Sequence, residues 1–155
     1  YDIHKIDKNT KVGLKLCGVK IPFSKLIGHS DADVGLHAIC DSIFGALSMR
    51  DIGYYFPNTD IRWKKANSAK FINFCRKKLS ENNYKITNLD INIIAERPKI
   101  SKYVNRMKKT IAELLKINRN IISIKATTNE KIGFIGNGEG IAAEAIVQIS
   151  NENVN

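Results

Sequence analysis

The sequence has few cysteines, and their spacing is not that of a metal knuckle. Cys17, Cys40 and Cys75 lie far apart, and no two form a C-x-x-C pair. This argues against a disulfide framework and against a zinc site built from thiolates. Any zinc ion would therefore need histidine and carboxylate ligands.

Long apolar runs are also missing. The longest, such as residues 91–95, are far shorter than the roughly 20 residues that a helix needs to cross a bilayer. No signal-peptide pattern precedes the first predicted strand, so we expect a soluble protein. The chain begins abruptly inside that strand, and we expect that a targeting leader has been removed from it.

Acidic residues are the minority among the charged ones. With 25 lysines and arginines against 15 aspartates and glutamates, the formal net charge is +10, which favours an anionic partner, either nucleic acid or a phosphorylated small molecule. Lysine, asparagine and isoleucine are nevertheless scattered along the chain, as AT-rich codon usage would produce. Basic runs such as 64–65 and 76–78 are expected on solvated faces, so charge alone supports phosphate binding only weakly.

Length and composition predict one domain over residues 1–150, with a frayed polar tail at 151–155. Of the 155 residues, 43% are hydrophobic, which is enough for a single core. Three helices are predicted. The first covers about 33–49, the second is capped by Ser68 and ends at the polar segment 81–83, and the third covers 102–116. Strands are predicted at 1–6, 12–21, 86–95, 121–128 and 141–150.

These elements predict an α+β fold, with helices packed on one face of a mainly four-stranded mixed sheet. The segment 86–95 becomes almost continuously apolar, as a central strand would be. Pro22 should end the strand at 12–21. The glycine-rich and proline-containing segments 49–60 and 129–140 should be loops.

The first candidate site begins at the N-terminal sequence YDIH. Asp2 and His4 are two residues apart, so in a strand both side chains point to the same face. A lone D-x-H pair is common by chance. All three histidines of the chain fall within its first 37 residues, however: His4, His29 and His37.

Residues 28–41, GHSDADVGLHAICD, offer a third ligand. In the predicted helix, Asp33, His37 and Asp41 form a polar stripe in which two carboxylates flank the imidazole and would orient it. A capped helix start with a surface ion pair explains this stripe equally well. With Asp2 and His4, however, His37 completes a set of three ligands with one position open, which is typical of catalytic zinc.

The second candidate site is the stretch IKATTNEKIGFIGNGEGIAAEA. Thr127 and Thr128 end a predicted strand and would present hydroxyl and N–H groups to phosphate, while Glu130 offers a hard oxygen ligand suited to magnesium. The segment 136–140 is not a dinucleotide loop, because a strand rather than a helix follows it. Its glycines are expected in turns and at close backbone approaches.

Five ordered motifs cover nearly the whole chain: the N-terminal D-x-H, HSDADVGLHAICD, DIGYYFPNTD, ERPK and KATTNEKIGFIGNGEG. In order and spacing they closely resemble the 2-C-methyl-D-erythritol 2,4-cyclodiphosphate synthase family of the non-mevalonate isoprenoid pathway. The resemblance implies a homotrimer with active sites between adjacent subunits. It also implies that 4-diphosphocytidyl-2-C-methyl-D-erythritol 2-phosphate cyclises when its 2-phosphate attacks the β-phosphorus and CMP leaves.

The same resemblance implies the metal ligands. Asp2, His4 and His37 would bind zinc, whose open position would take a phosphate oxygen, and Glu130 would bind a magnesium or manganese ion. No protein nucleophile is required. The protein would act by positioning two phosphates and neutralising their repulsion.

Substrate contacts are implied for both halves of the chain. His29, with Ser30, would contact the phosphate of the methylerythritol moiety, and Thr128 would help to stabilise the transition state; His29 and Thr128 are thus the expected catalytic residues. The cytosine would lie against 95–101 and 126–127 of the adjacent subunit. The other expected substrate contacts are Asp2, His4, Asp51, Gly53, Phe56, Asn58, Asp60, Ala95, Pro98, Lys99, Ile100, Ala126, Thr127, Glu130 and Phe134.

Three positions depart from the family pattern. Asn58 stands where an aspartate is usual, which leaves its role open. Asn137 stands where an arginine often faces a central cavity of the trimer implicated in binding isoprenoid diphosphates, so we expect any such binding to be weak. Lys5 follows the D-x-H motif where many members are apolar or aromatic. None of the three is an expected metal ligand.

Two other functions remain open from the sequence. A zinc phosphohydrolase would use an activated water and release inorganic phosphate. A basic nucleic-acid-binding module would interleave aromatic residues with lysines on one surface, which the clustered Tyr54, Tyr55 and Phe56 do not do, so we expect no nucleic-acid or membrane partner. Codon bias and pathway together predict a plastid-type organelle such as an apicoplast, or the bacterial cytoplasm.

Overall fold

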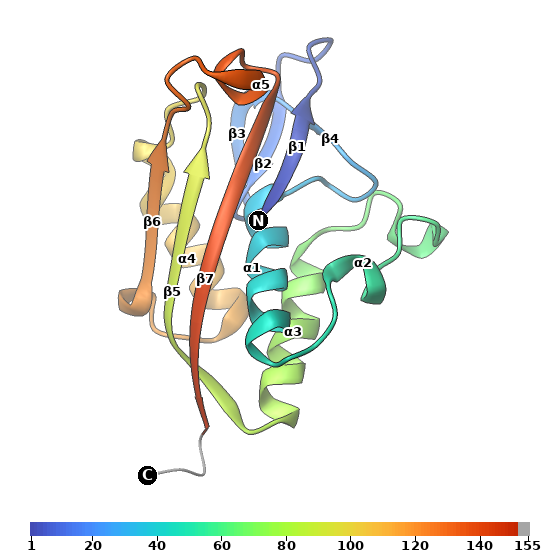
Figure 1. Cartoon of the computed structure of the whole chain (residues 1–155), viewed down its shortest axis with the longest axis vertical. Coiled ribbons are helices and arrows are strands. Elements are labelled where there is room, and N and C mark those ends of the chain that lie inside the picture. Colours follow the sequence, from blue (N-terminus) through green and yellow to red (C-terminus); the bar gives the residue numbers. More distant parts are fainter. Residues whose placement is uncertain (152–155) are drawn as a thin grey trace.

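A five-stranded mixed sheet forms the front layer of the computed structural model, which describes residues 1–151 (Figure 1). Its strand order is β4-β1-β7-β5-β6, in which β5 and β6 are parallel and the other neighbours are antiparallel. The strands are β1 (Asp2–Ile6), β4 (Leu26–Ile27), β5 (Tyr84–Ile94), β6 (Ile122–Thr127) and β7 (Gly140–Asn151). The α+β class and the mixed sheet were predicted correctly. The predicted number of strands was wrong, because the two-residue β4 is too short to show any periodicity.

The segment 12–21 was predicted as one strand, and the structure divides it. β2 (Gly13–Leu16) and β3 (Val19–Ser24) form a separate two-stranded antiparallel sheet. Between them the backbone turns at Cys17 and Gly18, which both have positive φ angles. Pro22 lies inside β3 instead of ending it, because each strand of a two-stranded sheet has a free edge on which a proline costs no ladder hydrogen bond.

The three longer helices pack on one face of the sheet, as predicted: α1 (Val34–Ala46), α3 (Ala69–Glu81) and α4 (Val104–Leu115). In Figure 1, α4 lies behind β5 and β6, and α1 and α3 are seen to the right of β7. α1 packs mainly on β7, α3 packs against β5, and α4 packs against β6. Each turns an apolar stripe towards the sheet; Leu36, Ile43 and Phe44 of α1 are fully buried. Burial of these stripes is the main source of helix stability in a fold of this kind.

Shorter elements occupy segments that were predicted as loops. They are α2 (Ile52–Tyr55), α5 (Gly133–Gly136) and single 3-10 turns at Ile61–Trp63, Ser101–Tyr103 and Arg119–Ile121. Elements of three or four residues are too short for a hydrophobic period. Asn151, which was placed in the polar tail, is the last residue of β7, and the rest of that tail lies outside the described residues.

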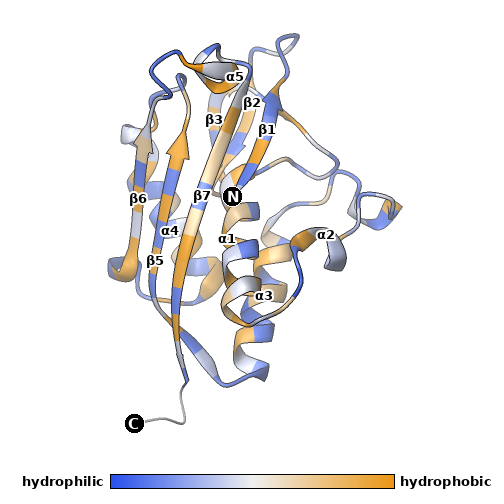
Figure 2. Ribbon diagram, viewed as in Figure 1, coloured by the Kyte–Doolittle hydropathy of each residue, from blue (hydrophilic) through white to orange (hydrophobic). Residues whose placement is uncertain are grey.

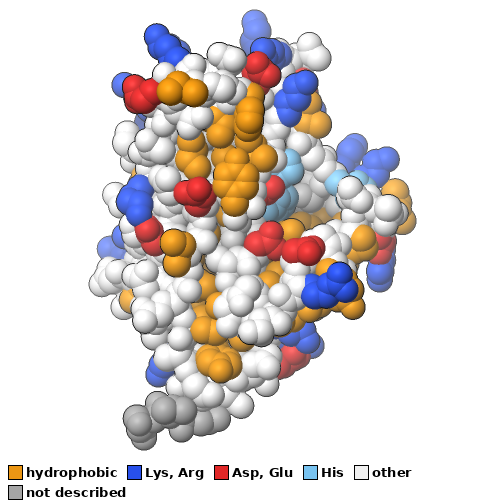
Figure 3. All heavy atoms as spheres, in the orientation of Figure 1, with side chains coloured by type: hydrophobic (Ala, Val, Ile, Leu, Met, Phe, Trp, Pro, Cys, Tyr) orange, Lys and Arg blue, Asp and Glu red, His pale blue; other side chains and the backbone are white. Residues whose placement is uncertain are grey.

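None of the three longer helices covers the front face of the sheet. On β7, Ala145 and Val147 pack on the core, whereas Glu144 and Ile146 point forward and are exposed, Ile146 at 74%. Figures 2 and 3 show hydrophobic residues along β5 and β7, with apolar side chains gathered over the upper parts of both strands. This uncovered face therefore carries exposed apolar residues together with polar ones such as Asp90, Asn92 and Glu144. No helix in residues 1–151 is both long and apolar enough to cross a membrane.

Candidate metal centre and active site

Asp2, His4 and His37, which we call the histidine cluster, meet between the sheet and α1. Asp2 and His4 alternate along β1 with the same phase as Ile6, a core residue, so they point towards the helices. His37 lies in the first turn of α1 and is 8% exposed. One ligand atom from each residue lies within 4.8 Å of the others. In Figure 3 histidine and acidic atoms lie side by side in a recess beside the sheet.

The three side chains approach one another through acceptor atoms. The Oδ2 atom of Asp2 lies 2.9 Å from Nδ1 of His37 and 3.1 Å from Nε2 of His4. These two ring nitrogens are themselves 3.1 Å apart. A carboxylate oxygen and two imidazole nitrogens at such distances repel one another unless a proton or a cation lies among them.

The outer nitrogen of each ring has its own partner. Nδ1 of His4 lies 3.0 Å from the carbonyl oxygen of Ile27, which can only accept, so this nitrogen carries a hydrogen and, when the ring is neutral, Nε2 has the free lone pair. Nε2 of His37 lies 2.9 Å from Oγ of Ser68 and 3.2 Å from Oγ of Ser30. Two imidazoles and one carboxylate, with outer partners that fix the rings, fit zinc with one position open.

Charge within the cluster is coupled. Burial raises the pKa of Asp2, but hydrogen bonds with His37 and His4 outweigh it and hold the pKa well below its usual range. Burial lowers the pKa of His4, while its hydrogen bond and ion pair with Asp2 raise it by more, so the net pKa is above the usual value. The metal-free cluster therefore favours a carboxylate–imidazolium pair, whose proton a metal would replace.

A pocket of about 210 Å³ opens beside the cluster. It is lined by His4, His29, Ser30, His37, Ile52, Gly53, Phe56, Asn58, Trp63 and Phe71. Stacking of Phe56 on Phe71, with ring centroids 4.4 Å apart, forms part of its wall. Five expected substrate contacts (His29, Ser30, Gly53, Phe56 and Asn58) are thus brought next to two of the expected zinc ligands.

Two expected substrate contacts point their carboxylates elsewhere. Asp51 begins α2 and accepts a hydrogen bond from the N–H of Tyr54 at 2.9 Å. Asp60 pairs with the guanidinium of Arg62 at 2.6 Å, although its carbonyl oxygen lies 3.2 Å from Nε2 of His29. Neither carboxylate lines the pocket beside the cluster.

The prediction that two carboxylates flank His37 and orient it was wrong, whereas the alternative of a capped helix start is confirmed for Asp33, which caps α1. Asp33 is fully buried and accepts hydrogen bonds from the backbone N–H groups of Cys17, Gly18 and Leu36. Asp41 accepts from the N–H of Ile52 at 2.7 Å. Both carboxylates thus hold neighbouring segments in place, and His37 faces the interior rather than solvent. Helical spacing shows which residues share a face but not which face is buried.

Ser68 and Asp31 were missed as parts of the site. Ser68 was predicted to cap α3, but its side chain makes no cap hydrogen bond and reaches His37 and the Asp31 carboxylate instead. Asp31 belongs to the HSDAD motif, yet it lies outside the helix, so its spacing to His37 gave no signal. The only sequence signal for Asp31 was its membership in a recognised motif, and the only one for Ser68 was that it lies near such a motif.

The second candidate site is an exposed turn after β6, residues 127–131, which we call the threonine turn. Oγ1 of Thr128 donates to Oε1 of Glu130 at 2.5 Å. Glu130 and Lys131 both have positive φ angles, which are unfavourable for residues with a side chain. The Glu96 carboxylate accepts hydrogen bonds from the N–H groups of Asn129 and Lys131 and so holds the turn.

The remaining expected contacts lie near this turn. Ala126 and Thr127 line a cavity of about 390 Å³, and Pro98 and Lys99 line another of about 540 Å³. The N–H of Ala95 donates to the carbonyl oxygen of Thr127. Ile100 is buried in the core, while Phe134 of α5 is 56% exposed.

One chain does not bring the two groups together. Asp2 pairs with Ala143, Ala143 with Ile93, and Ile93 with Ala126, so Asp2 and Ala126 lie on one row of the sheet with β7 and β5 between their strands. Three strand spacings of about 4.8 Å put the two backbones about 14 Å apart. Within the described residues, the histidine cluster and the threonine turn therefore form separate surfaces.

Comparisons with known proteins agree with this architecture. Residues 1–150 match the model of the YgbB family. A 2-C-methyl-D-erythritol 2,4-cyclodiphosphate synthase from Clostridium perfringens is 50% identical over 147 residues, which cover 94% of this chain and 93% of that protein. The structure of an IspF from Plasmodium falciparum in complex with CDP has a TM-score of 0.86 at 41% identity, covering 98% of this chain and 93% of the other. A bifunctional IspDF from Campylobacter jejuni gives 0.90 at 38% identity, covering 96% and 40%.

Proposed function

The chain belongs to the YgbB family, whose relatives are 2-C-methyl-D-erythritol 2,4-cyclodiphosphate synthases, and on that premise we propose its reaction in detail. It cyclises 4-diphosphocytidyl-2-C-methyl-D-erythritol 2-phosphate to the 2,4-cyclodiphosphate and releases CMP, as a phosphorus–oxygen lyase of isoprenoid biosynthesis. The convergence of Asp2, His4 and His37 beside a small pocket carries this proposal.

The proposed reaction needs no nucleophile from the protein, because the substrate supplies its own. An oxygen of the 2-phosphate forms a bond to the β-phosphorus, and the bond from that phosphorus to the bridging oxygen breaks. The bridging oxygen leaves with CMP. The protein must therefore hold two anionic groups in contact and in line, which is a task of positioning and electrostatic stabilisation.

The histidine cluster supports a zinc site at this point. Oδ2 of Asp2, Nε2 of His4 and Nδ1 of His37 would hold the ion, and the bound ion would supply positive charge next to a phosphate oxygen. Glu130, in the exposed threonine turn, would hold magnesium or manganese. Both metals belong to the proposal, and the donor atoms present suit each of them.

Residues around the pocket would then hold the substrate. The Ser30 hydroxyl is near His37 and offers a donor to the 2-phosphate. His29 has one nitrogen at the Asp60 carbonyl, so only the protonated ring has a second N–H for that phosphate. Phe56 and Gly53 would face the methylerythritol moiety, and Thr128 would donate to the phosphates during transfer.

We also propose that the active protein is a homotrimer with each site between two copies. The separation of the histidine cluster from the threonine turn supports this, because a substrate bound by both needs them adjacent. Exposed apolar residues on the uncovered face of the sheet, such as Ile146, support it further, since they are typical of a subunit interface. The 95–101 and 126–127 segments of one copy would then bind cytosine next to the histidine cluster of another.

A product assay tests this proposal. The purified protein is incubated with the cytidylated substrate, with and without a chelator, and the products are identified by phosphorus NMR and mass spectrometry. We expect CMP and the cyclic diphosphate, and neither after metal removal. Inorganic phosphate would instead indicate a zinc phosphohydrolase. The cellular compartment, a plastid-type organelle or the bacterial cytoplasm, stays a prediction.

A further inference from the structure

A chain of hydrogen bonds connects His37 to a basic cavity on the far side of the loop before α1. Ser68, fully buried, is its central member. The Ser68 hydroxyl donates to the Asp31 carboxylate, and the Ser68 N–H reaches the same carboxylate at 3.1 and 3.2 Å. A hydroxyl has only one hydrogen, so towards His37 it can only accept.

The direction of this chain fixes the proton on His37. Nε2 of His37 lies 2.9 Å from Oγ of Ser68 and must carry the hydrogen that Ser68 accepts. When His37 is neutral, Nδ1 is then left with a free lone pair that faces Asp2 and His4, and only the protonated ring can also donate from Nδ1 to the Asp2 carboxylate. This is the tautomer that a metal ligand needs at that atom.

Asp31 maintains the direction because it accepts hydrogen bonds and donates none. Nζ of Lys15 lies 2.5 Å from Oδ2 of Asp31 and 2.7 Å from Oδ1 of Asn67. Burial raises the pKa of Asp31, but the hydrogen bonds from Lys15 and Ser68 outweigh it and leave the pKa below its usual value. Asp31 therefore stays a carboxylate at neutral pH.

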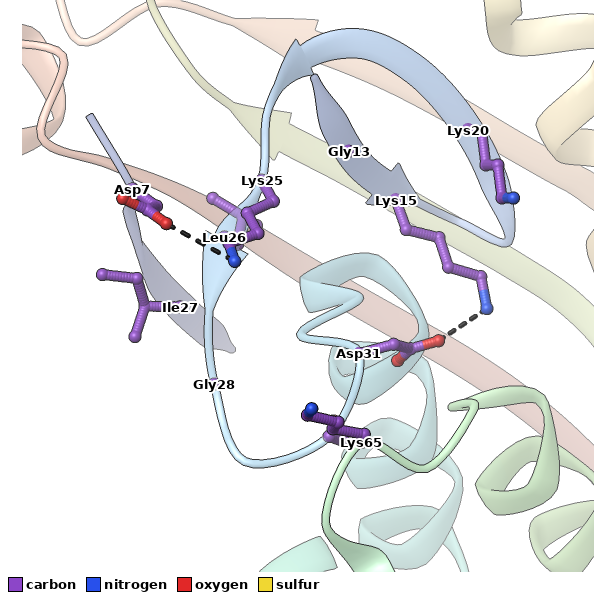
Figure 4. A pocket seen from close by; sticks show the side chains of 11 residues that line it. Asp7, Gly13, Lys15, Lys20, Lys25, Leu26, Ile27, Gly28, Asp31 and Lys65 are labelled. Carbon is purple, nitrogen blue, oxygen red and sulfur yellow. Dashed lines mark hydrogen bonds and ion pairs between the residues drawn. The ribbon is translucent and has the colours of Figure 1, made fainter. Parts of the chain in front are cut away.

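Figure 4 shows Lys15 reaching Asp31 from the wall of a cavity of about 670 Å³. The charged residues of this wall are Asp7, Lys15, Lys20, Lys25, Asp31 and Lys65. Four ammonium groups against two carboxylates give a positive environment that favours the ionised form of Asp31. The basic cavity thus stabilises the charged Asp31 carboxylate at the outer end of the hydrogen-bond chain.

We propose that Lys15, Asp31 and Ser68 are positioning residues that fix the tautomer of His37 and thereby set the zinc affinity of the histidine cluster. The inference rests on the zinc site of the proposed function and deepens it. His4 provides an internal comparison, because the backbone carbonyl of Ile27 fixes its tautomer and no side-chain substitution in the chain removes that carbonyl.

Asp31→Asn separates this role from a structural one. The amide keeps the size of the carboxylate, and its oxygen would face the Lys15 ammonium, which leaves its NH₂ group towards Ser68. The Ser68 hydroxyl must then accept from the amide and donate to Nε2 of His37. We expect His37 to change to the tautomer with hydrogen on Nδ1, and the zinc affinity to fall about tenfold to a hundredfold.

Ser68→Ala removes the chain at its centre. His37 then keeps only the Ser30 hydroxyl, 3.2 Å from its Nε2, which can either accept from that nitrogen or donate to it, so we expect a mixture of tautomers with a similar fall in zinc affinity, about tenfold to a hundredfold. The matched control is Ser42→Ala in α1, where the hydroxyl only donates to the Ile39 carbonyl at 2.8 Å. We expect this control to retain both the tautomer and the affinity.

Two measurements test the proposal on the full chain. Histidine tautomers are read from long-range proton–nitrogen NMR spectra of the metal-free protein at about pH 9, well above the usual histidine pKa of about 6.5. Zinc affinity is measured by competition with a chromogenic chelator. In all variants His4 should keep its hydrogen on Nδ1.

An Asp31→Asn protein that keeps the wild-type His37 tautomer and binds zinc as tightly as Ser42→Ala would overturn the inference. If Ser68→Ala does not fold, Asp31→Asn decides alone. A wild-type protein that binds no zinc would contradict the proposed function, while the tautomer measurement would still decide the direction of the hydrogen-bond chain.

Discussion

The histidine cluster and the threonine turn differ in how far one chain builds them. In the cluster, Ile27 of β4 and Ser68 beside α3 hold the outer ring nitrogens of two half-buried to buried histidines. In the turn, Thr128 and Glu130 are exposed and bond to each other, and the Glu96 carboxylate from another segment accepts from the neighbouring N–H groups of Asn129 and Lys131. One chain therefore pre-organises the proposed zinc ligands, whereas in the proposed trimer a neighbouring copy and the substrate would complete the phosphate-facing groups.

The largest expected effect comes from His37→Ala. It removes one of three proposed zinc ligands and leaves a cavity next to Asp2 and His4. CMP release should fall by about a thousandfold or more, because the cluster no longer holds the charge that stabilises the reacting phosphates. Mass spectrometry measures the zinc content of the variant, and circular dichroism checks that it is folded. Full activity in a zinc-free His37→Ala protein would refute the metal assignment.

Ile146→Glu tests whether the two regions meet between copies. Ile146, 74% exposed on the uncovered face, would place a charge beside Glu144 within the proposed interface. We expect a monomer in light scattering, with CMP release reduced about a hundredfold and zinc binding retained. Ile61→Glu is the matched control, since Ile61 is 73% exposed in a 3-10 turn and should tolerate the charge. If both variants formed trimers equally well, the proposal that the interface lies on this face of the sheet would be contradicted.

A smaller effect is expected from Glu96→Ala in the clamp of the threonine turn. Two N–H groups lose their acceptor, and the turn with its two positive φ angles becomes less ordered. We expect turnover to fall about tenfold while zinc affinity stays unchanged, because the histidine cluster lies elsewhere. Glu96→Gln keeps an acceptor oxygen and should restore most of the turnover. Loss of zinc from Glu96→Ala would show that the two regions are not independent.

The smallest expected effect is a pH dependence confined to the histidine cluster. In the metal-free protein the pKa of His4 is raised, so its stabilising contribution is complete below the ordinary histidine pKa of 6.5 and is lost as the pH rises through the raised value. Zinc needs the neutral ring, so the stabilisation by zinc should grow over the same range. Thermal melts with and without zinc between about pH 6 and 9 should therefore diverge as the pH rises. Parallel curves would contradict the coupling.

The sequence predicted the residues of both regions but not what holds them. The two-residue spacing of Asp2 and His4 predicted that both side chains share one face of β1, and the structure shows that this is the helix side. Clustering of the histidines and the ligand chemistry of Glu130 pointed to His37 and Glu130, and the family motifs gave both residues their roles. The contact of Ser68 with Asp31 and His37 depends on how α3 packs against the loop before α1, which no local pattern records. The same reason explains the mistaken role of Asp33, whose partners lie in the turn between β2 and β3.

Mixing two inactive variants tests the central claim most directly. His37→Ala keeps a normal threonine turn, and Glu130→Gln keeps a normal histidine cluster. The two variants are mixed in equal amounts, unfolded together and refolded into random trimers. If each site uses the cluster of one copy and the turn of another, about a quarter of the sites should be intact, and CMP release should recover to about a quarter of the wild-type rate. No recovered activity, from mixed trimers verified by mass spectrometry, would contradict a site shared between copies.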